Sequence, residues 1–272
     1  MTMRYQSRIT VLLLSVALLI PLAQIAPREG HGEEPARITV LYDNIQYDPH
    51  CATAWGYAAL IEHGEHVYLF DTGGDGSTLL SNMRALGVDP ERIEAVILSH
   101  AHGDHTGGLI DLLGVGIDPP VYLLPSFPPE LKSDIARLTE VIEVTAGQSV
   151  GAGVYVTGEV QGAVPEQAVI VATDSGLVVL TGCAHPGVVA LVARAKDLRG
   201  EPVHLVMGGF HLRNASSEQL QSIISELHSL GVAKVAPSHC TGEAAIAAFR
   251  TGYGAGFVES GAGKVVLLSG AS

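Results

Sequence analysis

Positively charged side chains and cysteines are scarce in this 272-residue chain. It has 15 lysine and arginine residues against 28 aspartate and glutamate residues, which gives a formal net charge of −13. The basic residues are scattered, and an acidic surface without a basic patch repels polyanions. The three cysteines, Cys51, Cys183 and Cys240, are odd in number and too few for a disulfide framework. The composition therefore argues against a nucleic-acid-binding protein and against a disulfide-stapled scaffold.

Two catalytic motifs are absent from the chain, and histidine is absent from one long interval of it. The glycine-rich stretch "DTGGDGS" (71–77) lacks the lysine that a phosphate-binding P-loop needs. No GxSxG sequence occurs in a strand–turn–helix context, which excludes the nucleophile of a serine hydrolase of that type. No histidine occurs between residues 106 and 184. The first two absences exclude two common site architectures, and the third limits where metal ligands can come from.

The amino-terminal stretch, residues 1–26, has the pattern of an export signal. Arg4 and Arg8 precede an apolar run, and no acidic residue occurs before Glu29. An uncleaved membrane anchor is the alternative, because the run approaches the roughly 17 to 20 apolar residues that span a bilayer. We therefore expect an exported protein, periplasmic or extracellular, or one that its amino-terminal segment attaches to a membrane. Residues 27–272 are expected to form a single domain.

The rest of the chain combines strand-like and helix-like patterns. "YAALIEHGEHVYLFDTGG" (57–74) reads as a hairpin, "STLLSNMRALGV" (77–88) as a helix with a glycine stop, and "IEAVILSH" (93–100) as a strand. Later in the chain, residues 168–182 again have the pattern of strands, and residues 216–230 again have the pattern of a helix. This order predicts an α/β (α+β) fold in which two sheets pack face to face with helices outside both.

A histidine-rich segment follows the predicted strand 93–100. "LSHAHGDHTGGL" (98–109) contains His100, His102, Asp104 and His105, four ligand-type side chains within six residues. At a strand end, alternate residues project to the same side, so His100 and His102 can converge on one ion. The turn at Gly103 then lets Asp104 and His105 point toward a second ion. Imidazole and carboxylate ligands suit zinc, iron or manganese, and they leave a coordination position open for water.

The same residues carry a family resemblance. The HxHxDH pattern, preceded about thirty residues earlier by "LFDTG", resembles the metallo-β-lactamase superfamily. Seven stretches also resemble, in the same order, the dihydropterin-ribofuranosylaminobenzene phosphate synthase group: "TVLYDN", "GYAALIE", "LFDTGG", "SHAHGDHTGGL", "TGCAHPG", "GGFHL" and "PSHCTG". That group commonly has tyrosine where this chain has Gly103. The resemblance implies a four-layer αββα sandwich with one or two metal ions in the cleft between the sheet edges.

The remaining metal ligands must come from later in the chain. His185, in "TGCAHPG", is the first histidine after the empty interval and becomes the candidate replacement. By resemblance, Cys183 lies near the position of an aspartate that bridges both metals, and a thiolate beside two dications can ligate. A small buried thiol is the alternative for Cys183. His239 matches the final metal histidine of the superfamily, whereas the adjacent Cys240 is expected to point away and to pack.

Two further residues are predicted to support the chemistry. Gly208 and Gly209 permit a close backbone approach beside His211, and by resemblance this histidine lies next to the metals as a general acid or a phosphate contact. A structural histidine is the alternative. Asp71, in "LFDTGG", is expected to accept a hydrogen bond from a ligand histidine and so to fix its tautomer.

We therefore expect a metal-dependent hydrolase that uses a metal-activated water on a small ester or phosphoester. The predicted cofactors are two divalent metal ions, zinc first, with iron or manganese as alternatives. Asp104 and His211 are the predicted catalytic residues, and a small molecule rather than a nucleic acid is the expected partner. Rival readings are a β-lactamase or lactonase, a mononuclear iron thiol oxygenase, and a metal-binding sensor without catalysis.

Overall fold

The computed structural model describes residues 35–268. The predicted export signal or anchor, residues 1–26, lies outside these described residues. Within residues 35–268, no helix combines the length and the apolar character that crossing a membrane would need.

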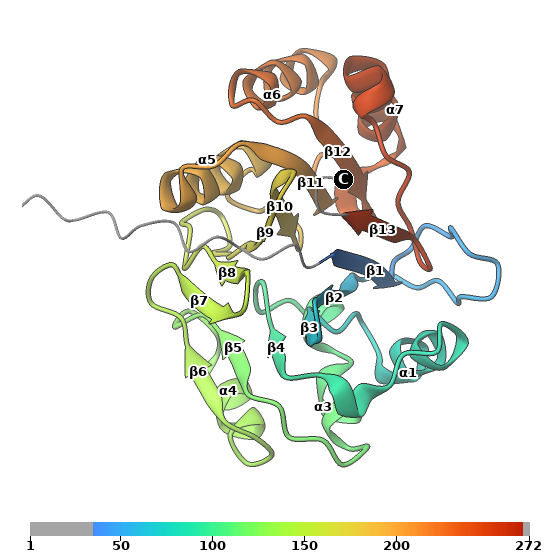
Figure 1. The fold of residues 1–272 in the computed structure, drawn as a ribbon, viewed down its shortest axis with the longest axis vertical. Helices are drawn as coiled ribbons and strands as arrows, with labels where there is room; N and C mark the ends of the chain where they lie inside the picture. Colours follow the sequence, from blue (N-terminus) through green and yellow to red (C-terminus); the bar gives the residue numbers. More distant parts are fainter. Residues whose placement is uncertain (1–34, 269–272) are drawn as a thin grey trace, which may run out of the picture. The chain divides into compact units, whose positions relative to one another are not determined.

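Two sheets form the centre of the fold (Figure 1). The first has, in spatial order, β13 (Val265–Leu268), β1 (Ala36–Tyr42), β2 (Ala58–His63), β3 (His66–Phe70), β4 (Ala95–Ile97), β5 (Val121–Leu123) and β6 (Val141–Glu143). The second has β12 (Lys234–Ser238), β11 (Val203–Gly209), β10 (Gly176–Thr181), β9 (Val169–Thr173), β8 (Val154–Val156) and β7 (Gln148–Gly151).

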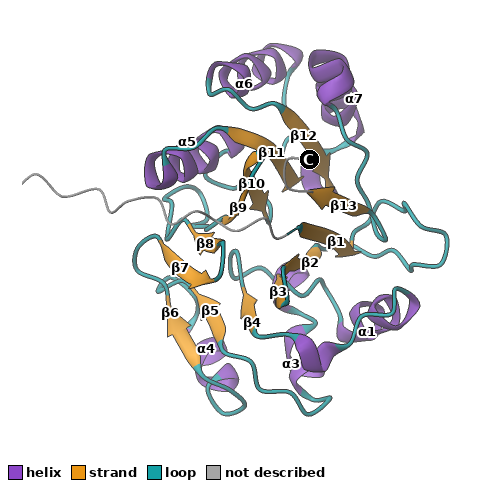
Figure 2. Ribbon diagram, in the orientation of Figure 1, coloured by secondary structure: helices purple, strands orange, loops and turns teal. Residues whose placement is uncertain are grey.

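The helices lie on the outer faces of the two sheets (Figure 2). They are α1 (Gly76–Ala85), α2 (Gly103–Thr106), α3 (Leu109–Leu113), α4 (Pro129–Ile135), α5 (Val188–Arg199), α6 (Ser217–Ser229) and α7 (Glu243–Tyr253). Three short 3₁₀ turns complete the order: η1 (Pro90–Arg92), η2 (His239–Thr241) and η3 (Gly254–Gly256). Helices α5, α6 and α7 cover the second sheet, and α1, α3 and α4 lie beside the first (Figure 1).

In the second sheet, successive side chains of a strand belong to two different apolar cores, one on each face of the sheet. On β9, Val169 and Val171 belong to the core that includes the first sheet, whereas Ile170 between them belongs to a second core with Leu191 and Val192 of α5. Successive side chains of a strand point to opposite faces, so a strand that is apolar throughout must be covered on both sides. The predicted four-layer αββα sandwich is confirmed.

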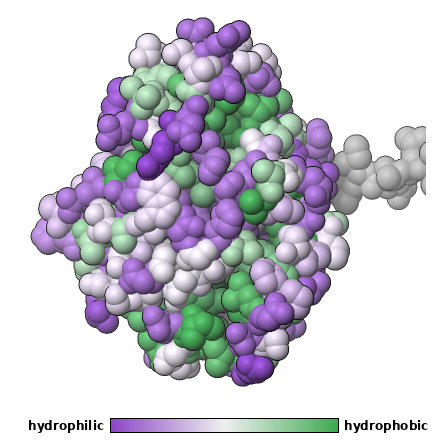
Figure 3. All heavy atoms as spheres, turned by 180° about the vertical axis from the view of Figure 1, so that it is seen from behind, coloured by the Kyte–Doolittle hydropathy of each residue, from purple (hydrophilic) through white to green (hydrophobic). Residues whose placement is uncertain are grey.

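One strand pairing joins the first and the last strands of the described residues. β13, near the carboxyl end of the described residues, pairs antiparallel with β1, and Ala36 lies opposite Leu268. The last described strand thus completes the first sheet although it follows all the strands of the second. Figure 3 shows one face of the described chain, where apolar patches are interrupted by polar residues.

The parallel strands position the functional loops. β3 and β4 are parallel in the first sheet, and β10, β11 and β12 are parallel in the second. In sheets of this kind, ligands bind outside the carboxyl ends of the strands. The segments that follow these five strands begin at Asp71, Leu98, Gly182, Phe210 and His239, and they contain all the predicted ligands.

Candidate metal centre

The histidine-rich segment is a loop and a short helix rather than a strand end. β4 ends at Ile97, and α2 begins at Gly103 with His102 as its N-cap residue. The expectation that His100 and His102 project from an extended strand is therefore wrong, because the strand stops three residues before His100. Their ring nitrogens converge nonetheless, since Nε2 of His100 lies 3.1 Å from Nδ1 of His102.

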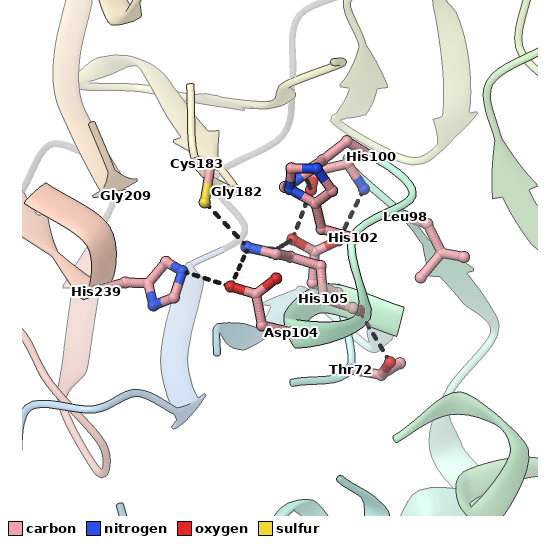
Figure 4. A network of polar contacts seen from close by, with 12 residues as sticks. Thr72, Leu98, His100, His102, Asp104, His105, Gly182, Cys183, Gly209 and His239 are labelled. Atoms are coloured by element: carbon pink, nitrogen blue, oxygen red, sulfur yellow. Dashed lines mark hydrogen bonds and ion pairs between the residues drawn. The ribbon is translucent and has the colours of Figure 1, made fainter. Parts of the chain in front are cut away.

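One group of potential ligands combines Asp104, His105, Cys183 and His239 (Figure 4). Nε2 of His105 lies 3.2 Å from Sγ of Cys183 and 3.7 Å from Oδ2 of Asp104. Nε2 of His239 lies 3.4 Å from the same carboxylate oxygen. The turn of α2 therefore aims Asp104 and His105 at residues that the second sheet supplies.

A second group combines His100, Cys183 and His185, whose ligand atoms all lie within 4.8 Å of one another. The ring centroid of His102 lies 4.8 Å from that of His185, so His102 borders the same space. The structure thus brings together all seven residues predicted as ligands. Cys183 belongs to both groups and lies between them.

Cys240 is placed differently from the sequence expectation. It lies in η2, and this turn directs its thiol toward Cys183 and His211, with the ligand atoms of the three residues within 4.8 Å of one another. The prediction that Cys240 points away from the site is wrong, because it assumed an extended segment. The hydrogen bond between the two thiols, followed by burial, raises the pKa of Cys183, and the same bond lowers the pKa of Cys240 to about 4.

Two ligand histidines are held by hydrogen bonds to their outer ring nitrogens. Nδ1 of His105 donates to Oδ2 of Asp71 at 2.7 Å, as predicted for Asp71. Nδ1 of His239 donates to Oδ1 of Asn44 at 2.8 Å, and the Asn44 amide donates back to the His239 carbonyl. Such partners fix which nitrogen faces a metal. Asn44 was not predicted, since it lies 195 residues away in the sequence.

Glu166 is the second functional residue that sequence reasoning missed. Its buried carboxylate accepts hydrogen bonds from four consecutive backbone N–H groups, those of residues 182 to 185, at 2.8 to 3.0 Å. Ala184, in the middle of this loop, has a φ of 60°, which non-glycine residues rarely adopt. Glu166 therefore shapes the loop that presents Cys183 and His185. Burial raises the pKa of Glu166 to about 7.

The electrostatics favour neutral imidazoles at His100 and His185 and an ionised Asp104. Burial, followed by the neighbouring histidines, lowers the pKa of His100, and burial lowers the pKa of His185 to about 4. For Asp104, burial acts to raise the pKa, but His239 and His105 outweigh it and the pKa lies well below the usual value. For His105, burial acts to lower the pKa, but the Asp71 carboxylate outweighs it and the pKa is raised.

The chemistry of the donor set fits divalent metal ions. Nε2 of His185 is buried and has no hydrogen-bond partner among the described residues. Within the same residues, Nε2 of His239 makes no hydrogen bond either. Buried polar atoms are nearly always satisfied, so orphaned nitrogens aimed into a cluster of imidazole, carboxylate and thiolate groups indicate that a ligand belongs there.

His211 borders the cluster on its outer side. It is exposed, its ring centroid lies 4.3 Å from that of His185, and its φ is 53°. A hydrogen bond with Cys240 raises the pKa of His211. His211 therefore lies next to the candidate ligand His185 and lines a cleft of about 640 Å³.

Comparison with known proteins agrees with this geometry. The sequence profile of the metallo-beta-lactamase superfamily matches residues 56–239. The 7,8-dihydropterin-6-methyl-4-(beta-D-ribofuranosyl)-aminobenzene-5'-phosphate synthase of Methanocaldococcus jannaschii is 31% identical over 244 residues, which cover 73% of this chain and 83% of that protein. The chain therefore belongs to the metallo-beta-lactamase superfamily, and it is similar to this synthase.

Solved structures share the fold. Tm1679, described as a metal-dependent hydrolase of the beta-lactamase superfamily, is 26% identical with a TM-score of 0.72, and the match covers 86% of this chain and 99% of that one. YhfI of Bacillus subtilis, a metallo-beta-lactamase fold protein, is 19% identical with a TM-score of 0.64, over 86% of this chain and 99% of that one. The second likeness concerns the fold alone.

Proposed function

We propose that this member of the metallo-beta-lactamase superfamily is a metal-dependent hydrolase of a small ester or phosphoester. The observation that carries the proposal is the shared cysteine. Asp104, His105 and His239 form one ligand group and His100 and His185 another, and Cys183 belongs to both. Two neighbouring groups with one common ligand favour two divalent ions, with zinc as the first expectation and iron or manganese as alternatives.

A divalent ion in such a site supplies a bound water of lowered pKa and a charge that stabilises a developing oxyanion. The protein residues supply the rest. His239 and His105 keep Asp104 ionised, so its carboxylate can serve as a metal ligand and accept a hydrogen bond from a water beside the reacting centre. His211 is exposed toward the cleft and has a raised pKa, which suits donation of a proton to the leaving oxygen.

The position of His211 also separates proton donation from metal binding. Its ring borders His185, but it belongs to a group with the two cysteines and not to either group that contains Asp104 or His100. We therefore assign His211 to the leaving group and the five predicted ligand histidines to the metals: His100, His102, His105, His185 and His239.

A second candidate follows from the 31% identity to the synthase. In this reading the same cluster serves formation of a dihydropterin–aminobenzene conjugate rather than hydrolysis. The two candidates are distinguished by the reaction: hydrolysis consumes esters without a second organic substrate, whereas the synthase reaction needs two.

The test is elemental analysis of the purified chain, followed by assays on phosphodiester, phosphomonoester, lactone and β-lactam substrates. We expect bound transition metal and turnover of an ester, with loss of turnover on chelation. One iron per chain and thiol oxidation in place of hydrolysis would support a thiol oxygenase instead. Tight metal binding without turnover of any substrate would support a sensor.

We also propose that the protein acts after export, from the pattern of residues 1–26. Fractionation of expressing cells should recover the chain outside the cytoplasm. Sequencing of its amino terminus would separate a cleaved signal from a retained membrane anchor.

A further inference from the structure

A cleft adjoins both ligand groups. Its volume is about 640 Å³, and Trp55, His211, Arg213 and Cys240 are among the residues that line it. The ring centroid of Trp55 lies 4.8 Å from that of His239. On the other side, His211 is next to His185. The cleft is therefore separated from His239 by the Trp55 side chain and from His185 by the His211 side chain.

The Arg213 side chain lines this cleft, and its positive charge is not paired with a carboxylate of residues 35–268. Its guanidinium carbon lies 4.7 Å from the centroid of the Trp55 ring, and it makes no hydrogen bond or ion pair within residues 35–268. Arg137 pairs with Asp134, and Arg250 pairs with Glu259. Within residues 35–268 Arg84 also makes no ion pair, but it does not line the cleft. In a chain with a net charge of −13, an arginine left without a carboxylate partner is available to an anion.

The one acidic side chain among the residues lining the cleft is Glu226. Its carboxylate accepts a hydrogen bond from Ser222 at 3.0 Å, one turn earlier on α6. It forms no ion pair with Arg213 in the described part of the chain. The cleft therefore offers a free guanidinium on one side and an already hydrogen-bonded carboxylate on another.

Close backbone contacts hold Arg213 and Trp55 in place. Gly242 has a φ of 85°, and a Cβ atom there would lie 2.7 Å from Cα of Arg213. A Cβ atom at Gly74 would lie 2.7 Å from the carbonyl oxygen of Trp55. Gly242 follows η2, which carries His239, and Gly74 lies three residues after Asp71. These contacts pack the backbone at Arg213 and at Trp55 against the segments that build the metal centre.

We propose that the substrate carries a phosphate or carboxylate group, remote from the bond that is broken, which binds Arg213, and a planar apolar part that lies on Trp55. A guanidinium presents a rigid fork of donors that matches either anion. Its stacking on an indole limits the entropy lost on binding. The part of this inference that concerns bond cleavage rests on the proposed hydrolysis, but anion binding in the cleft does not.

The binding test uses Trp55 as its reporter, because it is the single tryptophan of the chain. The purified full chain is titrated with phenylphosphonate, and in a parallel series with benzoate, while the indole fluorescence is recorded. We expect a saturable change with at least one of the two anions. Arg213→Gln should raise the dissociation constant about tenfold or more, and Arg213→Lys should restore part of the affinity.

Arg84→Gln is the matched control, since Arg84 lies in the last turn of α1 and not in the cleft. It should bind as the wild type does. Equal affinity of the wild type and Arg213→Gln would overturn the proposal, because the anion would then be held by the metals alone. The absence of a saturable signal with both anions would overturn it as well.

A kinetic test addresses the substrate. Two aryl esters share the reacting bond and differ in a remote ring substituent, a carboxylate in one and a carboxamide in the other. The wild type should show a kcat/KM ratio, charged over neutral, of about ten or more, and Arg213→Gln should bring that ratio near one, mainly through KM. A ratio unaffected by Arg213→Gln would contradict the assignment. If no ester is turned over, the proposed hydrolysis fails, while the fluorescence titration still decides whether Arg213 binds the anion.

Discussion

The two sides of the metal centre differ in how firmly they are built. The side with His105 and His239 is buried, and each of these rings is held by a hydrogen bond, to Asp71 and to Asn44. The opposite side has His102 and His211, both exposed. Under the proposed function, the buried side holds an ion with fixed geometry. The exposed side leaves space for water and substrate, which is where catalysis on a bound molecule has to occur.

The largest effect is expected from Asp71→Ala on the buried side. The Asp71 carboxylate is fully buried and accepts hydrogen bonds from Ser99 N, Ser99 Oγ and His105 Nδ1 at 2.7 to 2.8 Å. Its removal leaves these donors unsatisfied and frees His105 to rotate. The free energy of unfolding should fall by about 3 to 5 kcal/mol. Chemical denaturation measures the loss of stability, and metal analysis measures whether the freed His105 lowers the metal content.

The control for Asp71 is Asp134→Ala, which breaks an exposed ion pair with Arg137. It should change the free energy of unfolding by less than about 1 kcal/mol. Equal stability and metal content of the two variants would contradict the distinction between the buried and exposed sides.

Another effect concerns the residue between the two sides. Cys183→Ala should lower the metal content from about two ions per chain toward one and reduce metal affinity about tenfold or more. Cys51→Ala is the matched control, because Cys51 is another buried free cysteine that belongs to neither ligand group. Full retention of both ions in Cys183→Ala would show that the thiol only packs.

On the exposed side, His211→Gln should lower kcat on the best ester by about 10² to 10⁴ while leaving the metal content intact. The physical reason is that His211 borders the ligands but belongs to neither group that contains Asp104 or His100. His204→Gln, from β11, is the control and should retain kcat. A loss of metal in His211→Gln would instead assign this side chain to the metal.

The smallest effect is expected at the start of α1. Asp75 is the N-cap of α1, and its carboxylate accepts hydrogen bonds from Thr78 N at 2.8 Å and from the Ser77 and Tyr42 hydroxyls at 2.7 Å. Asp75→Ala should cost about 1 kcal/mol of unfolding free energy without a change in metal content.

The pH dependence of this cap has a definite sign. The Thr78 N–H, followed by the Ser77 hydroxyl, lowers the pKa of Asp75 to about 2 in the folded state. A depressed folded-state pKa stabilises the protein above the unfolded pKa, and this contribution is lost as pH falls through about 2. The difference in stability between the wild type and Asp75→Ala should therefore shrink between about pH 4 and pH 2. A difference that stays constant over that interval would contradict the assignment.

Local patterns predicted what depends on local sequence. Apolar runs separated by turn residues, as in 168–182, predicted the strands, and segment 98–109 supplied four of the candidate ligands. The absence of histidine between residues 106 and 184 led to His185. These inferences succeed because periodicity and residue type determine which face of an element is buried.

Contacts between distant segments were not predictable in this way. Asn44 meets His239 across 195 residues, and the Glu166 carboxylate binds a loop that follows another strand. The pairing of β13 with β1 is of the same kind. Cys240 was placed wrongly because nothing in "PSHCTG" distinguishes an extended segment from the 3₁₀ turn that forms there. Each of these features depends on the tertiary arrangement rather than on a repeating pattern.

The central claim is that the seven ligands hold metal for hydrolysis. The most direct measurement is the transition-metal content of the purified chain, together with its ester hydrolysis before and after chelation and in His102→Ala. We predict about two ions per chain, loss of hydrolysis on chelation, recovery on adding zinc, and strongly reduced hydrolysis in His102→Ala. A chain that hydrolyses esters without bound transition metal, and equally well with His102→Ala, would contradict the account.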